Sequence, residues 1–122
     1  MAITLVYYYQ TGSYLYRSPR GENLSISRSE YLVGIDISHY QGHIDWSDVN
    51  LSGHPIKYVF IRATMGKNGK DTLFAYNWEK AKAYGYLRGA YHYYRPNENS
   101  TEQFNNFAST VILQSGDFPP IL

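Results

Sequence analysis

Short apolar runs separated by amphipathic stretches form the main pattern of the chain from Leu32 onward. The runs lie at 32–37, 58–63, 88–94 and 118–122, and they begin about 30 residues apart, which is the length of one βα unit. Apolar runs of this length without polar alternation are typical of strands buried on both faces. The pattern therefore predicts consecutive parallel strands joined by crossovers.

The stretch between the second and third runs has helical periodicity. Residues 71–84 place Phe74, Trp78 and Ala81 on one face. Gly85 follows directly and is a common C-terminal stop signal. We expect a helix here that packs this face against the sheet.

A second helix is predicted after the third run. Ser100 and Gln103 fit a capping box, in which each side chain satisfies a backbone N–H of the other, and Gly116 is expected to end the helix. Its apolar stripe at i, i+3, i+4 and i+7 is predicted to face the core, and consists of Phe104, Phe107, Ala108 and Val111.

Repeated βα units imply an α/β fold, either an open doubly wound sheet or a barrel. Three and a half units correspond to the first half of a β/α (TIM-like) barrel. A half barrel leaves strand edges unpaired, so we expect more chain, or a partner, to supply the remaining C-terminal half. Residues 32–122 are predicted to form this partial barrel domain, which reaches the start of its fourth strand.

Residues 1–31 are predicted to be a separate N-terminal extension and linker. The β-prone stretches at 3–9 and 14–17 flank a turn at 10–13, which favours a β-hairpin.

Composition narrows the possible functions. The hydrophobic fraction is 43% and the charged fraction 17%, typical of a globular chain. A net charge of +1 gives no electrostatic case for binding nucleic acid or an anionic membrane. No apolar run approaches the length of a membrane span, and the N-terminus shows no secretory signal pattern. The chain has no Cys but 14 Tyr, a residue that fills strands and also grips sugars or proteins.

Asp36 is the leading candidate for chemistry. It lies near the end of the first predicted strand between Ile35 and Ile37. Because strand side chains alternate, Asp36 points into the barrel if the isoleucines pack on helices. The carboxyl ends of the strands build the active site of βα barrels. Asp36 is therefore either catalytic or a cap for the turn that follows.

Residues 34–46 read GIDISHYQGHIDW, and this stretch resembles the opening signature of family 25 glycoside hydrolases. Other motifs follow in the family's order: FIRAT at 60–64 with Gly66, then Asp71, Phe74 and Asn77, GAYHY at 89–93 and DFPPIL at 117–122. The resemblance covers about residues 32–122. It implies an irregular β/α barrel and a lysozyme (muramidase) that hydrolyses the β-1,4 bond between N-acetylmuramic acid and N-acetylglucosamine in peptidoglycan. It also implies no metal or cofactor and an extracellular or cell-envelope location.

By this resemblance Asp36 matches the family's active-site aspartate. Tyr91 and Tyr93 match aromatic positions on the third strand and share a parity, so both are expected to face the lumen, where they bind sugar or fill the core. Gln41 is expected to touch substrate or to orient the loop after the first strand.

The resemblance also implies a catalytic Asp-x-Glu motif directly after a Pro-Pro-aliphatic run like the one that ends at Leu122. A glycosidase normally needs two carboxyl groups, so we expect the acid glutamate to lie outside these 122 residues. Met65 departs from the family, which often has an acidic residue there. Two alternatives to a hydrolase remain: an inactive glycan-binding remnant, and an interaction module that docks through residues 1–31.

Two further features are less specific. His39 and His43 lie four residues apart, but Gly42 intervenes and no third ligand is evident, so no metal site is expected. Arg62 shares a parity with Phe60 and Thr64. It is expected either to face Asp36 and favour its ionised form, or to form a buried structural ion pair.

Overall fold

The structure is a computed structural model that describes residues 4–8, 15–17, 23–25, 32–49 and 56–122. Its elements are, in chain order, β1 (Thr4–Tyr8), β2 (Leu15–Arg17), β3 (Asn23–Ser25), β4 (Leu32–Ile37), the 3-10 helix η1 (His39–Gln41), β5 (Ile56–Met65), β6 (Gly69–Lys70), α1 (Phe74–Ala83), β7 (Leu87–Tyr93) and α2 (Ser100–Thr110).

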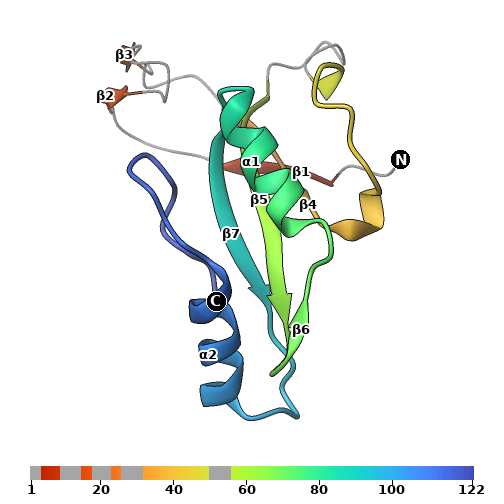
Figure 1. Cartoon of the computed structure of the whole chain (residues 1–122). Helices are drawn as coiled ribbons and strands as arrows, with labels where there is room; N and C mark the ends of the chain where they lie inside the picture. Colours follow the sequence, from red (N-terminus) through yellow and green to blue (C-terminus); the bar gives the residue numbers. More distant parts are fainter. Residues whose placement is uncertain (1–3, 9–14, 18–22, 26–31, 50–55) are drawn as a thin grey trace.

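Strand β5 is the centre of a five-stranded sheet (Figure 1). It pairs in parallel with β4 on one side and with β7 on the other. The short β6 pairs antiparallel with its end. Residue Ile121 forms a parallel bridge to Tyr91, so the last described residues add to the free edge of β7. The parallel strands at 32–37, 58–63 and 88–94 are thus confirmed within one or two residues, and the run at 118–122 contributes this single bridge.

One face of the three parallel strands is covered by the helices, and we call it the outer face. Side chains of Ile35, Ile37, Val59 and Ile61 are at most 1% exposed there and pack with Trp78 of α1. Helix α1 lies along the sheet in Figure 1, and its buried residues include the predicted Phe74, Trp78 and Ala81. The mixed α/β class predicted from the sequence is confirmed.

The opposite, inner face is lined by residues of the other parity. Asp36 of β4 pairs with Phe60 of β5, and Arg62 of β5 pairs with Tyr91 of β7. The ring of Phe60 stacks on Phe118 with their centroids 5.5 Å apart. Aromatic and charged groups therefore share this face.

Two glycines on the inner face make room for aromatic rings. A Cβ on Gly34 would collide with the ring of Tyr58, and one on Gly89 would collide with the ring of Phe60. In both places the ring of a β5 residue lies across the backbone of its neighbour, which only a glycine permits.

A bulge in β5 ends the simple alternation. The pairing with β7 shifts between Arg62 and Thr64, so Thr64 turns to the outer face and its Oγ1 lies 2.7 Å from Nδ1 of His92. The expectation that Thr64 points the same way as Arg62 was wrong, because an extra residue in one strand breaks the two-residue period.

The predicted N-terminal hairpin was wrong in its pairing. Strand β1 pairs antiparallel with β4, from Thr4 opposite Asp36 to Tyr8 opposite Leu32, so it belongs to the main sheet. The hairpin partners are instead β2 and β3. Strand propensity identifies β-prone residues but not their partners, and the free edge of β4 offers unpaired backbone groups that β1 satisfies. The expected turn at 10–13 lies outside the described residues.

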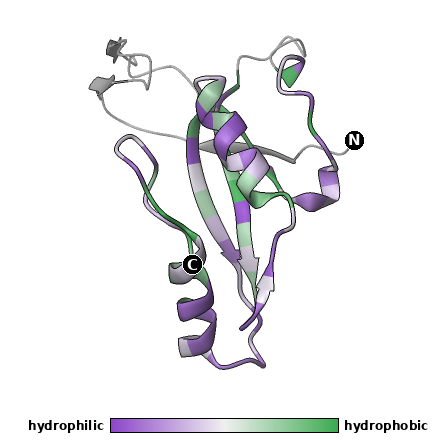
Figure 2. Ribbon diagram, in the orientation of Figure 1, coloured by the Kyte–Doolittle hydropathy of each residue, from purple (hydrophilic) through white to green (hydrophobic). Residues whose placement is uncertain are grey.

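The second helix is present but its cap, end and buried face differ from expectation. Its N-cap is Asn99, whose Oδ1 accepts from Glu102 N–H over 3.0 Å. The helix ends at Thr110, well before Gly116. Phe107 is buried as predicted, but Phe104 is 54% exposed, and the other buried residues are Gln103 and Asn106. Figure 2 shows α2 as largely hydrophilic.

Hydrogen bonds explain why polar residues of α2 face inward. Gln103 contacts the ring of His92 and both backbone groups of Arg95. Asn106 donates to the carbonyls of Gly66 and Gly69, each over 3.0 Å. These side chains satisfy the buried backbone of the two turns beside β7 and β5, which an apolar side chain cannot do.

Candidate active site

Asp36 lies on the inner face at the end of β4, as predicted. Its neighbours Ile35 and Ile37 are each 1% exposed in the helix-side core, so strand alternation places the carboxylate on the other side. The carboxylate is partly exposed, but its Oδ1 is buried and has no hydrogen-bond partner. A buried carboxylate oxygen without a partner is costly, so Asp36 is the candidate ligand-binding group on this face.

Tyr91 faces the same space from the other side of β5. It is half-buried, and burial together with the negative charge of Asp36 raises the pKa of Tyr91 to about 12. The phenol therefore keeps its proton at any physiological pH and is an O–H donor on the same face of the sheet as the carboxylate. The structure brings together Asp36 and Tyr91, two of the residues selected from the sequence.

Arg62 forms the buried ion pair that was one of the two expectations for it. It is 5% exposed, and its Nε–H donates to Asp71 Oδ2 over 3.1 Å. A second guanidinium nitrogen lies 2.6 Å from Nδ1 of His39. The positive charge of Arg62 is thus committed to Asp71.

Asp71 is the residue at this site that reasoning from the sequence did not assign a role. Its side chain is fully buried, and the His39 backbone N–H and imidazole lie 2.9 and 3.0 Å from its Oδ2. Burial by itself pushes the pKa of Asp71 up, but hydrogen bonds from His39 and Leu73 and the charge of Arg62 outweigh it and hold this pKa below its ordinary value. The sequence feature that could have identified Asp71 is its place in the motif series, just ahead of α1.

Gln41 orders the loop that follows β4. Its Oε1 accepts from Ser38 N–H over 2.7 Å, which closes a capping box around η1. Gly42 then ends η1 with a positive φ of 67°. Two roles were considered for Gln41, and this geometry is consistent with the one in which it orients the loop. A contact of Gln41 with substrate stays a prediction.

Tyr93 lies farther out on β7 than Tyr91. It is 55% exposed, it pairs with Met65, and its carbonyl accepts from Gly66 N–H over 3.1 Å. Ala90 and His92, which alternate with the two tyrosines along β7, are buried on the helix side, as expected from parity. The role of Tyr93 in substrate binding stays a prediction.

The two histidines of the loop point to different neighbours. His39 belongs to the Arg62 and Asp71 cluster, whereas the ring of His43 packs edge-on against Tyr76 with centroids 4.8 Å apart. Within the described part of the chain, no group of three or more His, Cys, Asp or Glu side chains is arranged to hold a metal ion. Across the same residues, no helix combines the length and apolar character needed to cross a membrane.

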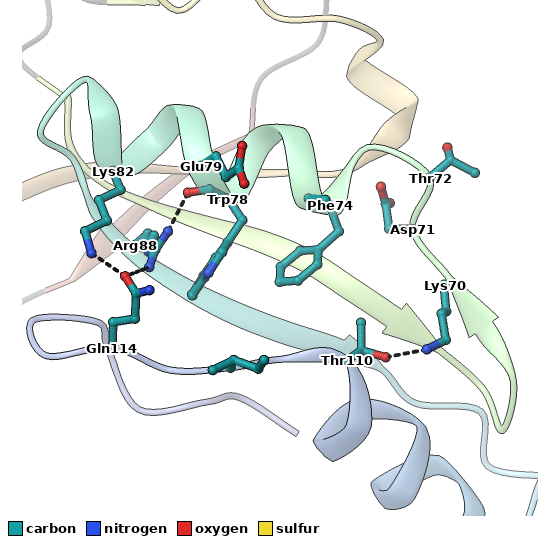
Figure 3. Close-up of a pocket in the computed structure, with 12 residues that line it drawn as sticks. Lys70, Asp71, Thr72, Phe74, Trp78, Glu79, Lys82, Arg88, Thr110 and Gln114 are labelled. Atoms are coloured by element: carbon teal, nitrogen blue, oxygen red, sulfur yellow. Dashed lines mark hydrogen bonds between the residues drawn. The ribbon is translucent and has the colours of Figure 1, made fainter.

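A cavity lies between α1 and the segment after α2, on the helix side of the sheet (Figure 3). Its volume is about 710 Å³, and Phe74 and Trp78 form its apolar wall. Two of its charged groups are paired: Lys82 with Gln114, and Arg88 with Trp78 O and Asp117. The Glu79 carboxylate in its lining is exposed, unlike the buried Oδ1 of Asp36.

Asp36 and Tyr91 lie near the carboxyl ends of β4 and β7, the edge at which β/α folds place their active sites. The particular family is found by comparison, since residues 35–122 match the family described as "Glycosyl hydrolases family 25". The chain belongs to glycosyl hydrolases family 25, which confirms the resemblance read from its motifs.

Individual relatives agree with this membership. Uncharacterized protein YegX of Escherichia coli (strain K12) is 38% identical over 112 residues, covering 89% of this chain and 41% of that protein. Lysozyme M1 of Streptomyces globisporus is 48% identical over 77 residues, covering 62% of this chain and 26% of the lysozyme. A solved family 25 glycosyl hydrolase from Bacillus anthracis superposes with a TM-score of 0.68 at 33% identity, covering 79% of this chain and 43% of that one. The chain thus spans less than half the length of these relatives.

Proposed function

We propose that the chain is part of a lysozyme-type hydrolase that cleaves the β-1,4 bond between N-acetylmuramic acid and N-acetylglucosamine in peptidoglycan. The observation that carries this proposal is the partnerless, buried oxygen of Asp36 at the carboxyl end of β4. Membership in a family that includes lysozymes supplies the substrate class. Action on wall peptidoglycan in turn implies an extracellular or cell-envelope location.

In the proposed reaction Asp36 stabilises or attacks the anomeric centre, where positive charge develops as the glycosidic bond breaks. Tyr91, which keeps its proton, donates a hydrogen bond to the carboxylate or to a sugar oxygen beside it. We expect Tyr93 to contact substrate through its exposed ring and Gln41 to act through the loop that it orders.

The proton for the leaving oxygen must come from a second carboxyl group. Asp71 is unsuited to this task, because its buried carboxylate is held ionised by Arg62 and His39. We propose that the acid lies outside the 122 residues, in the part of the enzyme that completes a β/α barrel begun by residues 32–122. The structure of β4, β5 and β7 supports this arrangement, with residues 118–122 adding at the edge of β7.

The test is release of reducing ends from purified peptidoglycan by an enzyme extended past Leu122, with Asp36→Asn as the variant. Loss of one carboxylate of a catalytic pair is expected to lower activity by at least about a hundredfold. Unchanged thermal unfolding of the variant would show that the fold is intact. Full activity in Asp36→Asn would overturn the assignment of Asp36.

One observation favours a second function, which is glycan binding without cleavage. Two carboxylates influence Tyr91 among the described residues, Asp36 and Asp71, and Asp71 is already paired with Arg62. A site with one available carboxylate can hold a glycan without cleaving it. In that case the 122-residue chain binds glycan fragments in titration calorimetry and releases no reducing ends. Lack of any affinity for wall fragments would count against this alternative.

A further inference from the structure

Tyr40 presents an aromatic ring to solvent beside the candidate active site. It follows Asp36 by four residues and is 77% exposed, although the strand before it is buried in the core. Exposing an aromatic ring forgoes the free energy that its burial would provide. The ring contacts Arg62, a residue of the inner face that also carries Asp36, and this position favours a functional explanation for its exposure.

The backbone at Tyr40 is held in place. Its N–H donates to Ser38 Oγ over 3.3 Å within the short helix η1. Gln41 closes the capping box on one side and Gly42 ends the helix on the other. The ring therefore projects from an ordered turn.

The ring is also supported from one side. The Arg62 guanidinium carbon lies 5.0 Å from the ring centroid, and the His39 ring lies 4.3 Å away at 32°. Both supporting groups are bonded to the buried carboxylate of Asp71, which thus acts as a positioning residue. Since the residue is still 77% exposed, most of the ring surface remains open to a ligand.

We propose that Tyr40 forms a stacking subsite for an N-acetylated sugar unit adjacent to the unit held at Asp36. This inference rests on the proposed function and adds a contact to it. A flat ring that is ordered in advance binds a pyranose through its C–H surface and loses little conformational entropy. The apolar face of this ring suits the C–H surface of a sugar better than it suits a charged group.

The test uses the 122-residue chain and peptide-free glycan strands from purified peptidoglycan, with affinity measured by titration calorimetry. Tyr40→Ala is expected to weaken binding by about tenfold, and Tyr40→Phe, which keeps the ring, by less than about twofold. The matched control is Tyr84→Ala, because Tyr84 is an exposed tyrosine, 44% accessible, at the end of α1. Its affinity is expected to equal that of the wild type.

Equal affinity of Tyr40→Ala and wild type would overturn the subsite while leaving the proposed function standing. An equal loss in Tyr84→Ala, or a loss seen only with peptide-bearing peptidoglycan, would also overturn it, because the contact would then be nonspecific or made to the peptide. If Tyr40→Ala weakens binding while the extended enzyme hydrolyses nothing, hydrolysis fails as the function and the subsite stands. Absence of any glycan binding by the wild-type chain would overturn the subsite, whereas the reducing-end assay on the extended enzyme tests the proposed function separately.

Discussion

The two faces of the same three parallel strands differ sharply. On the outer face, Ile37, Val59 and Ile61 are at most 1% exposed and pack against helices. On the inner face, Asp36 of β4 and Tyr91 of β7 occupy strand positions of the opposite parity and remain partly accessible. Because neighbouring side chains point to opposite faces, one strand segment contributes both to stability and to chemistry. Substitutions one residue apart should therefore have different consequences.

The largest loss of stability is expected when the buried ion pair between Asp71 and Arg62 is broken. Asp71→Asn removes the charge that compensates the buried Arg62, and breaking a buried ion pair in this way costs about 4 kcal/mol. Urea unfolding measures the change. An unfolding free energy within about 1 kcal/mol of wild type would mean that Arg62 finds another partner.

The same substitution tests the pH dependence. In the wild type the pKa of Asp71 lies below its ordinary value of 3.8, so its contribution to stability is present above that value and is lost as pH falls through the folded-state pKa. The acid-induced decrease in unfolding free energy should be shallower in Asp71→Asn.

On the outer face, Ile61→Ala is expected to cost about 3 kcal/mol, because it empties space around a side chain that is 0% exposed. Glycan affinity should stay unchanged at temperatures where the variant is folded, since Ile61 faces away from Asp36. Calorimetric unfolding and glycan titration on the same sample measure both quantities. A specific loss of glycan affinity without loss of stability would contradict the division between the faces.

The smallest effect on stability is expected for Tyr91→Phe on the inner face, and the unfolding free energy should change only in alkaline solution. The pKa of Tyr91 is raised from 10.0 to about 12, so the folded protein keeps a proton that the unfolded chain loses, and stability declines across this interval. Tyr91→Phe should remove that part of the decline. An ultraviolet absorbance titration should show one late-titrating tyrosine fewer, and an unchanged late phase would contradict the shift.

Reasoning from the sequence identified the parts of the fold in which burial is apolar. Strands β4, β5 and β7 are mainly apolar runs with single polar residues, and α1 shows its buried face through Phe74 and Trp78. Helix α2 was harder, because Gln103 is 1% exposed and serves backbone groups that no sequence pattern displays. A hydropathy pattern identifies side chains that are stabilised by leaving water. It does not show where a buried backbone group needs a side chain as its hydrogen-bond partner.

The candidate site was predicted where strand parity was sufficient and missed where it was not. Asp36 and Tyr91 follow from alternation together with a motif. The tie between Arg62 and Asp71 joins the end of a strand to the segment ahead of a helix, and its alternative, a pairing of Arg62 with Asp36, satisfied parity equally well. Only the folded path of the chain between residues 62 and 71 distinguishes these partners.

The central position of β5 has a geometric consequence for the site. Asp36 on β4 and Tyr91 on β7 are separated by one intervening strand, so their backbones stand two strand spacings apart, about 10 Å. Backbone hydrogen bonds maintain that width, whatever side chains occupy the faces. Evolution of such a site can change the side chains on this face freely, while the separation of the two strands changes only if a strand between them is gained or lost.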